Sequence, residues 1–177
     1  RATDGLERMS TESARFLQAL DDHKKIVFKV AQLYCRNPAD RQELAQEIVT
    51  QLWRSFGRFD GRSKLSTWMY RVALNVAISD GRDERRRGPT VPLEEVVLEA
   101  PAVAPDGGEV ARLLDRLGEL DRALILLYVE GHDHQTIAEV LGISATHVGT
   151  KIGRIKSRLR AEAAEGAAEK GNEDGSR

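Results

Sequence analysis

The stretch from residue 134 to residue 160 constrains the fold most, because it has the spacing of two short helices joined by a tight turn. Asp133 is a good N-cap for a first helix, and Gly142 stands where that helix needs a left-handed residue to end. Ser144 can cap a second helix, whose apolar residues recur at intervals of four, three and four: Val148, Ile152, Ile155 and Leu159. The pattern predicts a helix-turn-helix that buries one stripe of its second helix.

The opposite side of this second helix is expected to be exposed and basic. Residues 144–160 contain five Lys or Arg and no acid, so the segment favours a phosphate-rich partner. In such a motif the second helix enters the major groove of DNA. The candidate DNA contacts are Ser144, Thr146, His147, Thr150, Lys151, Arg154, Lys156 and Arg158. The alternative is an amphipathic hairpin at the end of a helical bundle, with solvated basic side chains.

The composition is that of an ordinary soluble protein, with 41% hydrophobic and 31% charged residues. The formal net charge is only −1, but residues 88–111 hold five acids and no base, which offsets the basic helix. The single cysteine, Cys35, excludes an intramolecular disulfide and a cysteine-rich zinc site. No apolar run approaches the ~18 residues of a membrane span, and no leader opens the chain. We therefore expect a cytoplasmic protein without membrane insertion.

The chain is expected to be all-α, with two small helical domains joined by an extended linker. Helical periodicity fills an N-terminal domain at residues 10–87 and a C-terminal domain at residues 109–160, which ends in the helix-turn-helix. Residues 88–108 hold four of the chain's five prolines and form an acidic linker. Residues 161–177 offer no core residue, so we expect a disordered tail.

Local signals also predict where individual helices break or begin. The polar run at residues 21–23 should divide the first helical segment into a short and a long helix. Asp40 should cap the next helix, and Ser63 or Ser66 the one after it. Asp121 should cap a helix of the C-terminal domain.

The helix that follows Asp40 carries a polar face opposite its apolar one. We predict an interaction surface of five residues on it: Glu43, Gln46, Glu47, Gln51 and Arg54. Glu43 and Glu47 place like charges one turn apart, which is unfavourable by a few tenths of a kcal/mol and could be compensated by an external cation. A solvated acidic face is, on its own, the commoner explanation.

Residues 57–64 are too polar to pack as an element and should form a loop. Arginines and aromatic residues beside a loop suit single-stranded nucleic acid, because rings stack on bases and guanidinium groups hold phosphates. The candidates in this loop and the next helix are Arg58, Phe59, Asp60, Arg62, Ser63, Lys64, Trp68, Tyr70, Arg71, Asn75 and Arg82. For Trp68 taken alone, a role in the core is the better interpretation.

The order of these features resembles the extracytoplasmic-function (ECF) sigma factors, members of the sigma-70 family of bacterial RNA polymerase. The resemblance spans about residues 16–160. Residues 43–47, Glu-Leu-Ala-Gln-Glu, precede a Leu-Trp pair and look like the family's acidic-Leu-x-Gln-Glu motif. Residues 66–75, Ser-Thr-Trp-Met-Tyr-Arg-Val-Ala-Leu-Asn, are similar to its Thr-Trp-Leu-x-x-Ile-Ala-x-Asn run.

The resemblance implies a function and a set of partners. In that family the first motif docks on the clamp coiled coil of the polymerase, the loop and following helix capture unpaired bases of the −10 element, and the last helix reads the −35 element. The chain would then bind core RNA polymerase through its beta and beta-prime subunits, and promoter DNA both as duplex and as single strand. An anti-sigma factor or another regulator is a further implied partner.

Other functional classes fit the sequence less well. An enzyme is not expected, because there is no phosphate-binding glycine loop and no nucleophile paired with a base, and no cofactor is implied. His132 and His134 flank Asp133 without a further carboxylate or thiolate, so no metal site is predicted. The rival is a conventional helix-turn-helix transcriptional regulator that dimerises through its N-terminal bundle. A third possibility is that this bundle chiefly docks an inhibitory protein.

Overall fold

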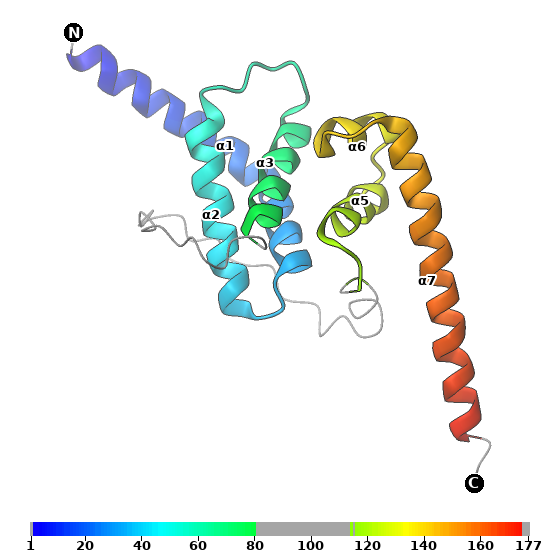
Figure 1. The fold of residues 1–177 in the computed structure, drawn as a ribbon. Helices are drawn as coiled ribbons and strands as arrows, with labels where there is room; N and C mark the ends of the chain where they lie inside the picture. Colours follow the sequence, from blue (N-terminus) through cyan, green and yellow to red (C-terminus); the bar gives the residue numbers. More distant parts are fainter. Residues whose placement is uncertain (1, 81–113, 115, 175–177) are drawn as a thin grey trace. The chain divides into compact units, whose positions relative to one another are not determined.

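A computed structural model describes residues 2–80, 114 and 116–174 of the chain, and Figure 1 shows these residues as helices and short connections. The chain divides into two compact units, residues 1–101 and 102–177. All regular structure in the described residues is helical, which confirms the predicted all-α class. The predicted linker at residues 88–108 lies outside the described residues. None of the described helices is both long enough and apolar enough to cross a membrane.

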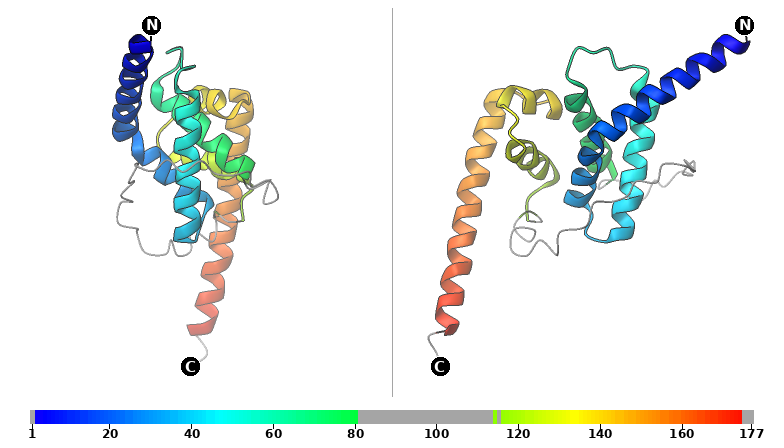
Figure 2. Two further views of the ribbon diagram at one scale, coloured as in Figure 1. Left: turned by 90° about the vertical axis from the view of Figure 1, so that its left-hand side faces the viewer. Right: turned by 180° about the vertical axis from the view of Figure 1, so that it is seen from behind.

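The first unit is a bundle of three helices, α1 (Ala2–Tyr34), α2 (Pro38–Phe56) and α3 (Leu65–Asp80), each of which contacts the other two. Its core consists of aliphatic side chains from all three helices, among them Val27, Val30, Ile48, Leu52, Met69 and Leu74. At one end, the ring of Phe16 packs edge-on against Trp53 at 5.1 Å and Phe56 at 5.3 Å between ring centroids. Figures 1 and 2 show the connection between α2 and α3 at this unit's edge.

Helix α1 is continuous, so the break predicted at residues 21–23 is wrong. The polar side chains of this run bond within the helix: Gln18 donates to Asp22 Oδ1 at 3.0 Å, and Lys24 Nζ donates to Asp21 Oδ1 at 2.8 Å. Such pairs at spacings of three and four stabilise a helix. Burial of apolar residues on both sides of the run, up to Leu20 and from Ile26 onward, keeps one face against the core.

Two helix starts in the first unit differ from the prediction. Asn37, not Asp40, caps α2: its side chain accepts a hydrogen bond from Ala39 N at 2.9 Å. Pro38 occupies the first helical position, where its missing N–H costs nothing and its fixed φ suits the helix. Helix α3 begins at Leu65, and the N–H of Trp68 donates to the carbonyl of Lys64, so neither predicted serine stands at its start.

The second unit contains α5 (Glu119–Val129), α6 (His134–Leu141) and α7 (Ala145–Asp174), again in mutual contact. Fully buried side chains from each helix form its core, including Leu124, Leu127, Ile137 and Val148. Helix α5 is entered from Gly118, whose backbone is extended, and Asp121 lies within its first turn. The predicted cap at Asp121 is therefore wrong by one turn.

Helix α7 runs to Asp174, where the sequence predicts a disordered tail from residue 161. Figures 1 and 2 show this helix extending well beyond α5 and α6. Two physical causes favour the extension. Alanine and glutamate, which dominate this stretch, are strong helix formers. Glu162 is also tied back into the unit by two arginines that are described below. The structure thus differs from the predicted disordered tail at residues 161–174, which are helical although they lack core residues.

Candidate nucleic-acid interface

The helix-turn-helix is built by local chemistry, as the sequence predicts. Asp133 caps α6 by accepting a hydrogen bond from Thr136 N at 2.7 Å, and this bond lowers the pKa of the Asp133 carboxyl. Gly142 ends α6 with φ 67°, in the left-handed region that favours glycine. Ser144 Oγ accepts a hydrogen bond from His147 N at 3.1 Å at the start of α7. All three predicted boundary residues are confirmed.

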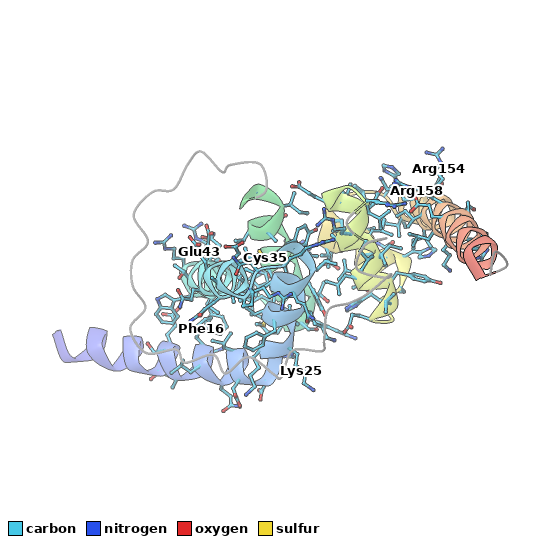
Figure 3. All side chains as sticks on the ribbon, turned by 90° about the horizontal axis from the view of Figure 1, so that it is seen from below. Phe16, Lys25, Cys35, Glu43, Arg154 and Arg158 are labelled. Carbon is cyan, nitrogen blue, oxygen red and sulfur yellow. The ribbon has the colours of Figure 1, made fainter. Side chains whose placement is uncertain are left out.

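The two faces of α7 separate as predicted. Val148, Ile152 and Ile155 are buried against the unit's core, whereas Leu159, the last residue of the predicted stripe, is half-buried. The exposed candidates are Ser144, Thr146, His147, Thr150, Arg154 and Arg158. Figure 3 shows Arg154 projecting outward from α7. Its guanidinium has no partner among the residues that the structure describes, so it is available to an external anion.

Two of the predicted basic contacts are engaged within the unit. Lys151 Nζ lies 2.6 Å from Asp121 Oδ1 of α5, and the two side chains are 24% and 27% exposed. Lys156 Nζ donates to the hydroxyl of Tyr128 at 2.6 Å and lies 4.3 Å from the centre of that ring. Both lysines are half-buried. They link α5 to α7 across the core edge, a role that sequence reasoning did not assign to them.

Arg158, also predicted as a DNA contact, belongs to a second internal cluster. Its Nε donates to Glu162 Oε1 at 2.8 Å, and its Nη2 donates to the carbonyl of Arg116 at 3.0 Å. Arg116 Nη1 lies 3.6 Å from Glu162 Oε2. We call these three residues the arginine clasp. The clasp fixes α7 to the segment that precedes α5. Only the bond between Arg158 and Glu162 could be predicted from sequence, because these residues lie four positions apart on one helix.

The connection at residues 57–64 forms an irregular turn, as predicted. Asp60 Oδ1 accepts a hydrogen bond from Arg62 N at 3.0 Å, and Gly61 has φ 73°. The side chains of Arg58, Asp60, Arg62 and Lys64 are exposed, whereas Ser63 is half-buried. The loop therefore presents three cations and one carboxylate around a tight turn.

The rings of Phe56, Trp68 and Phe59 pack against one another at the base of this loop, and we call these three residues the aromatic floor. Phe59 is half-buried, with its ring 5.3 Å from that of Trp68, and Trp68 is in turn 6.3 Å from Phe56. The two interpretations of Trp68, a core residue and a contact for nucleic acid, are compatible, because its half-buried ring packs against Phe56 and also borders the loop. Further along α3, Asn75 is exposed and Arg71 is half-buried.

One candidate of this set, Tyr70, is buried, and another is not described. Tyr70 is 4% exposed and packs in the bundle, so we withdraw it from the residues that could meet a base. Its position follows from the helical period, which places it on the core side with Thr67 and Ala77. Arg82 lies outside the described residues.

The polar face of α2 is exposed along its whole length, at Glu43, Gln46, Glu47, Gln51 and Arg54. The opposite face carries the buried Leu44, Ile48 and Leu52. Figure 3 shows Glu43 on the outside of this helix. The surface is therefore accessible to a partner, and equally to solvent. No three His, Cys, Asp or Glu residues in the described ranges gather closely enough to hold a metal ion.

Comparisons with known proteins agree on one family for both units. The sequence-family model of sigma-70 region 2 matches residues 19–87, and that of sigma-70 region 4 matches residues 107–159. The chain is similar to the ECF RNA polymerase sigma factor SigW of Bacillus subtilis, at 24% identity over 165 residues that cover 82% of this chain and 87% of SigW.

Two solved structures share the fold. CnrH, in a complex with the cytosolic domain of CnrY, gives a TM-score of 0.64 at 24% identity over 86% of this chain and 90% of that one. The sigma factor RpoE from Bartonella quintana, in a complex with the anti-sigma factor NepR, gives a TM-score of 0.63 at 17% identity. That alignment covers 83% of this chain and 95% of RpoE.

Proposed function

This chain belongs to the ECF sigma factors of the sigma-70 family, and from that premise we propose that it binds core RNA polymerase and directs it to promoters by recognising a −10 and a −35 element. The observation that carries this proposal is the pairing of two family regions on one chain, region 2 on the three-helix bundle and region 4 on the helix-turn-helix. A helix-turn-helix alone would fit many regulators. Its pairing with region 2 favours a sigma factor over a conventional regulator that dimerises through its bundle.

The exposed face of α2 is the proposed polymerase surface, comprising Glu43, Gln46, Glu47, Gln51 and Arg54. Its support is the combination of exposure and two like charges one turn apart, which suits a basic partner. Reversing one charge at the surface should weaken binding of core polymerase by on the order of 1 kcal/mol, roughly fivefold.

Glu47→Lys tests this surface, with Asp22→Lys as the matched control, because Asp22 is an exposed acid on α1 of the same unit. Affinity for core polymerase should fall for the first variant and hold for the second. Equal affinities for both variants, each still folded by circular dichroism, would show that the partner binds elsewhere.

The loop at residues 57–64 is proposed to act on unpaired promoter bases, together with Trp68, Arg71 and Asn75. The aromatic floor supports this role, since a base can stack on a half-buried ring while neighbouring cations hold its phosphates. Replacing Phe59 and Arg62 by alanine should reduce open-complex formation on duplex promoters more than on pre-melted ones. Lys25→Ala, which removes an exposed cation from α1, is the control. Equal losses on every template would indicate a non-specific role.

Helix α7 is proposed to read the upstream duplex. Thr146, His147 and Thr150 lie near its N-terminal end, where a helix in the major groove meets base edges. Arg154 has an accessible guanidinium and is the first choice for a phosphate contact. Lys151, Lys156 and Arg158 remain candidates only if DNA displaces their internal partners.

An inhibitory protein is a further proposed partner. Both structural relatives were solved in complex with a second protein, and for RpoE that protein is an anti-sigma factor. The proposed role requires no catalysis and no cofactor, and it places the protein in the cytoplasm with the polymerase.

Run-off transcription with core polymerase on a library of promoter fragments tests the function directly. Activity on a subset of fragments is expected; no product with any fragment would reject it.

A further inference from the structure

Lys151 lies at the edge of the proposed DNA-binding face of α7, but its charged group bonds to a residue of α5. On the helix it lies one turn from His147 and one turn from Arg154, both of which are exposed. Its ammonium group is nevertheless bonded to Asp121 of α5 at 2.6 Å, across 30 positions of sequence. A lysine at this position would otherwise extend toward the same partner as its two neighbours.

We propose that Asp121 competes with DNA phosphate for Lys151 and thereby limits the affinity of the chain for DNA of any sequence. This inference rests on the proposed role of α7 as a DNA-binding helix. A carboxylate and a phosphate oxygen are both anionic acceptors for an ammonium group, and the two anions repel one another, so they compete for Lys151. The pair is partly exposed, at 24% and 27%, so water and an incoming anion can reach it.

Asp121 would lower the affinity for DNA in two ways. It neutralises the charge that Lys151 would add to the DNA-facing edge, and its own negative charge repels an approaching phosphate. Tyr128 differs in this respect, because the hydroxyl and ring that hold Lys156 are neutral and leave the lysine charge in place. Asp121 is therefore a positioning residue whose removal should tighten binding to DNA, whereas loss of a purely structural contact would weaken it.

Asp121→Asn in the full chain is the test, measured against duplexes that carry a matched or a scrambled upstream element, over a salt series and with and without core polymerase. Once it is free of Asp121, Lys151 can contact a DNA phosphate and release one more counterion. The slope of the logarithm of the binding constant against the logarithm of the salt concentration should then rise in magnitude by about 0.9. Between about 50 and 200 mM salt this adds roughly a threefold loss of affinity. At low salt both duplexes should bind tighter by the same factor, because phosphate contacts carry no sequence information.

Two further variants isolate the proposed contact. Glu139→Gln removes the same charge from an exposed position of α6 and should leave the slope unchanged. In a Lys151→Gln background, Asp121→Asn should no longer raise the slope, because the added counterion-linked contact requires that lysine. Only the smaller gain in affinity from removing the repulsion of the carboxylate should remain. Hydrogen exchange of α5 and α7 amides shows in parallel that each variant is folded.

The inference is overturned if Asp121→Asn leaves the slope unchanged or lowers it, if Glu139→Gln raises the slope equally, or if the full rise in slope persists without Lys151. Its failure can be told apart from that of the proposed function. A parent chain that directs transcription while Asp121→Asn leaves the slope unchanged would remove the inference alone. A parent chain that neither binds promoter DNA with core polymerase nor directs transcription would remove both.

Discussion

Two glycines of the helix-turn-helix should respond in opposite ways to alanine. Gly142 ends α6 with φ 67° and ψ 32°, a conformation that costs an L-residue about 1–2 kcal/mol. Alanine also restricts the unfolded chain, which returns about 0.4–1 kcal/mol. Gly142→Ala should therefore destabilise the second unit by about 1 kcal/mol.

Gly153 lies inside α7, where an added Cβ would meet no atom within 4 Å. Alanine at this position should stabilise the helix by about 1 kcal/mol, the difference in propensity between the two residues in a helix interior. The two variants should thus differ by about 2 kcal/mol in the free energy of unfolding of this unit, a factor of roughly thirty in its equilibrium constant.

Hydrogen exchange followed by mass spectrometry measures this difference on the slowest amides of α6 and α7. The chain supplies an internal control, because both tryptophans, Trp53 and Trp68, lie in the first unit. Their fluorescence transition in urea should be the same in parent and variants. If Gly142→Ala proves as stable as the parent, or Gly153→Ala less stable, the reasoning from backbone conformation and open space is refuted.

Other consequences can be measured separately. Arg154→Ala should lower the magnitude of the salt slope for DNA binding by about 0.9, and an unaltered slope would mean that this arginine meets no phosphate. His147→Ala should instead change base preference at the upstream element without changing the slope; a preference that stays the same would place the base contacts elsewhere. The hydrogen bond from Thr136 N lowers the pKa of Asp133 in the folded chain, so it stabilises α6 fully at a pH above the unfolded pKa of about 3.9. This stabilisation is lost as the pH falls through the lower pKa of the folded chain. Exchange protection at the start of α6 should therefore fall in acid for the parent more than for Asp133→Asn, and parallel pH profiles would contradict this assignment.

The parts of the fold that could be predicted from sequence are those fixed by chemistry within a few residues. Asp133, Gly142 and Ser144 each act on a backbone group at most four positions away, so the turn and both helix starts follow from residue type. The buried stripe of α7 follows from the helical period in the same way. The exposed polar face of α2 was predicted by the same argument.

Three of the errors arise where contacts within the folded unit override local signals. The run at residues 21–23 reads as a break, but burial on both sides keeps α1 continuous. Asp121 reads as a helix cap, yet it lies within α5 and bonds a lysine 30 positions away. Tyr70 reads as an aromatic contact for a base, but its turn of α3 faces the core. The burial of Tyr70 follows from the helical period, but no periodicity in the sequence reports the pairing of Asp121 with Lys151.

The length of α7 makes it a lever. Its 30 residues span about 45 Å, and Ile155, the last buried side chain among those that the structure describes, lies about 28 Å along the axis from Asp174. A tilt of about 10° at that pivot would displace the far end by about 5 Å while barely moving the start of the helix. A fluorophore at the C-terminal end would therefore register how α7 seats on a partner far more sensitively than one placed beside the turn.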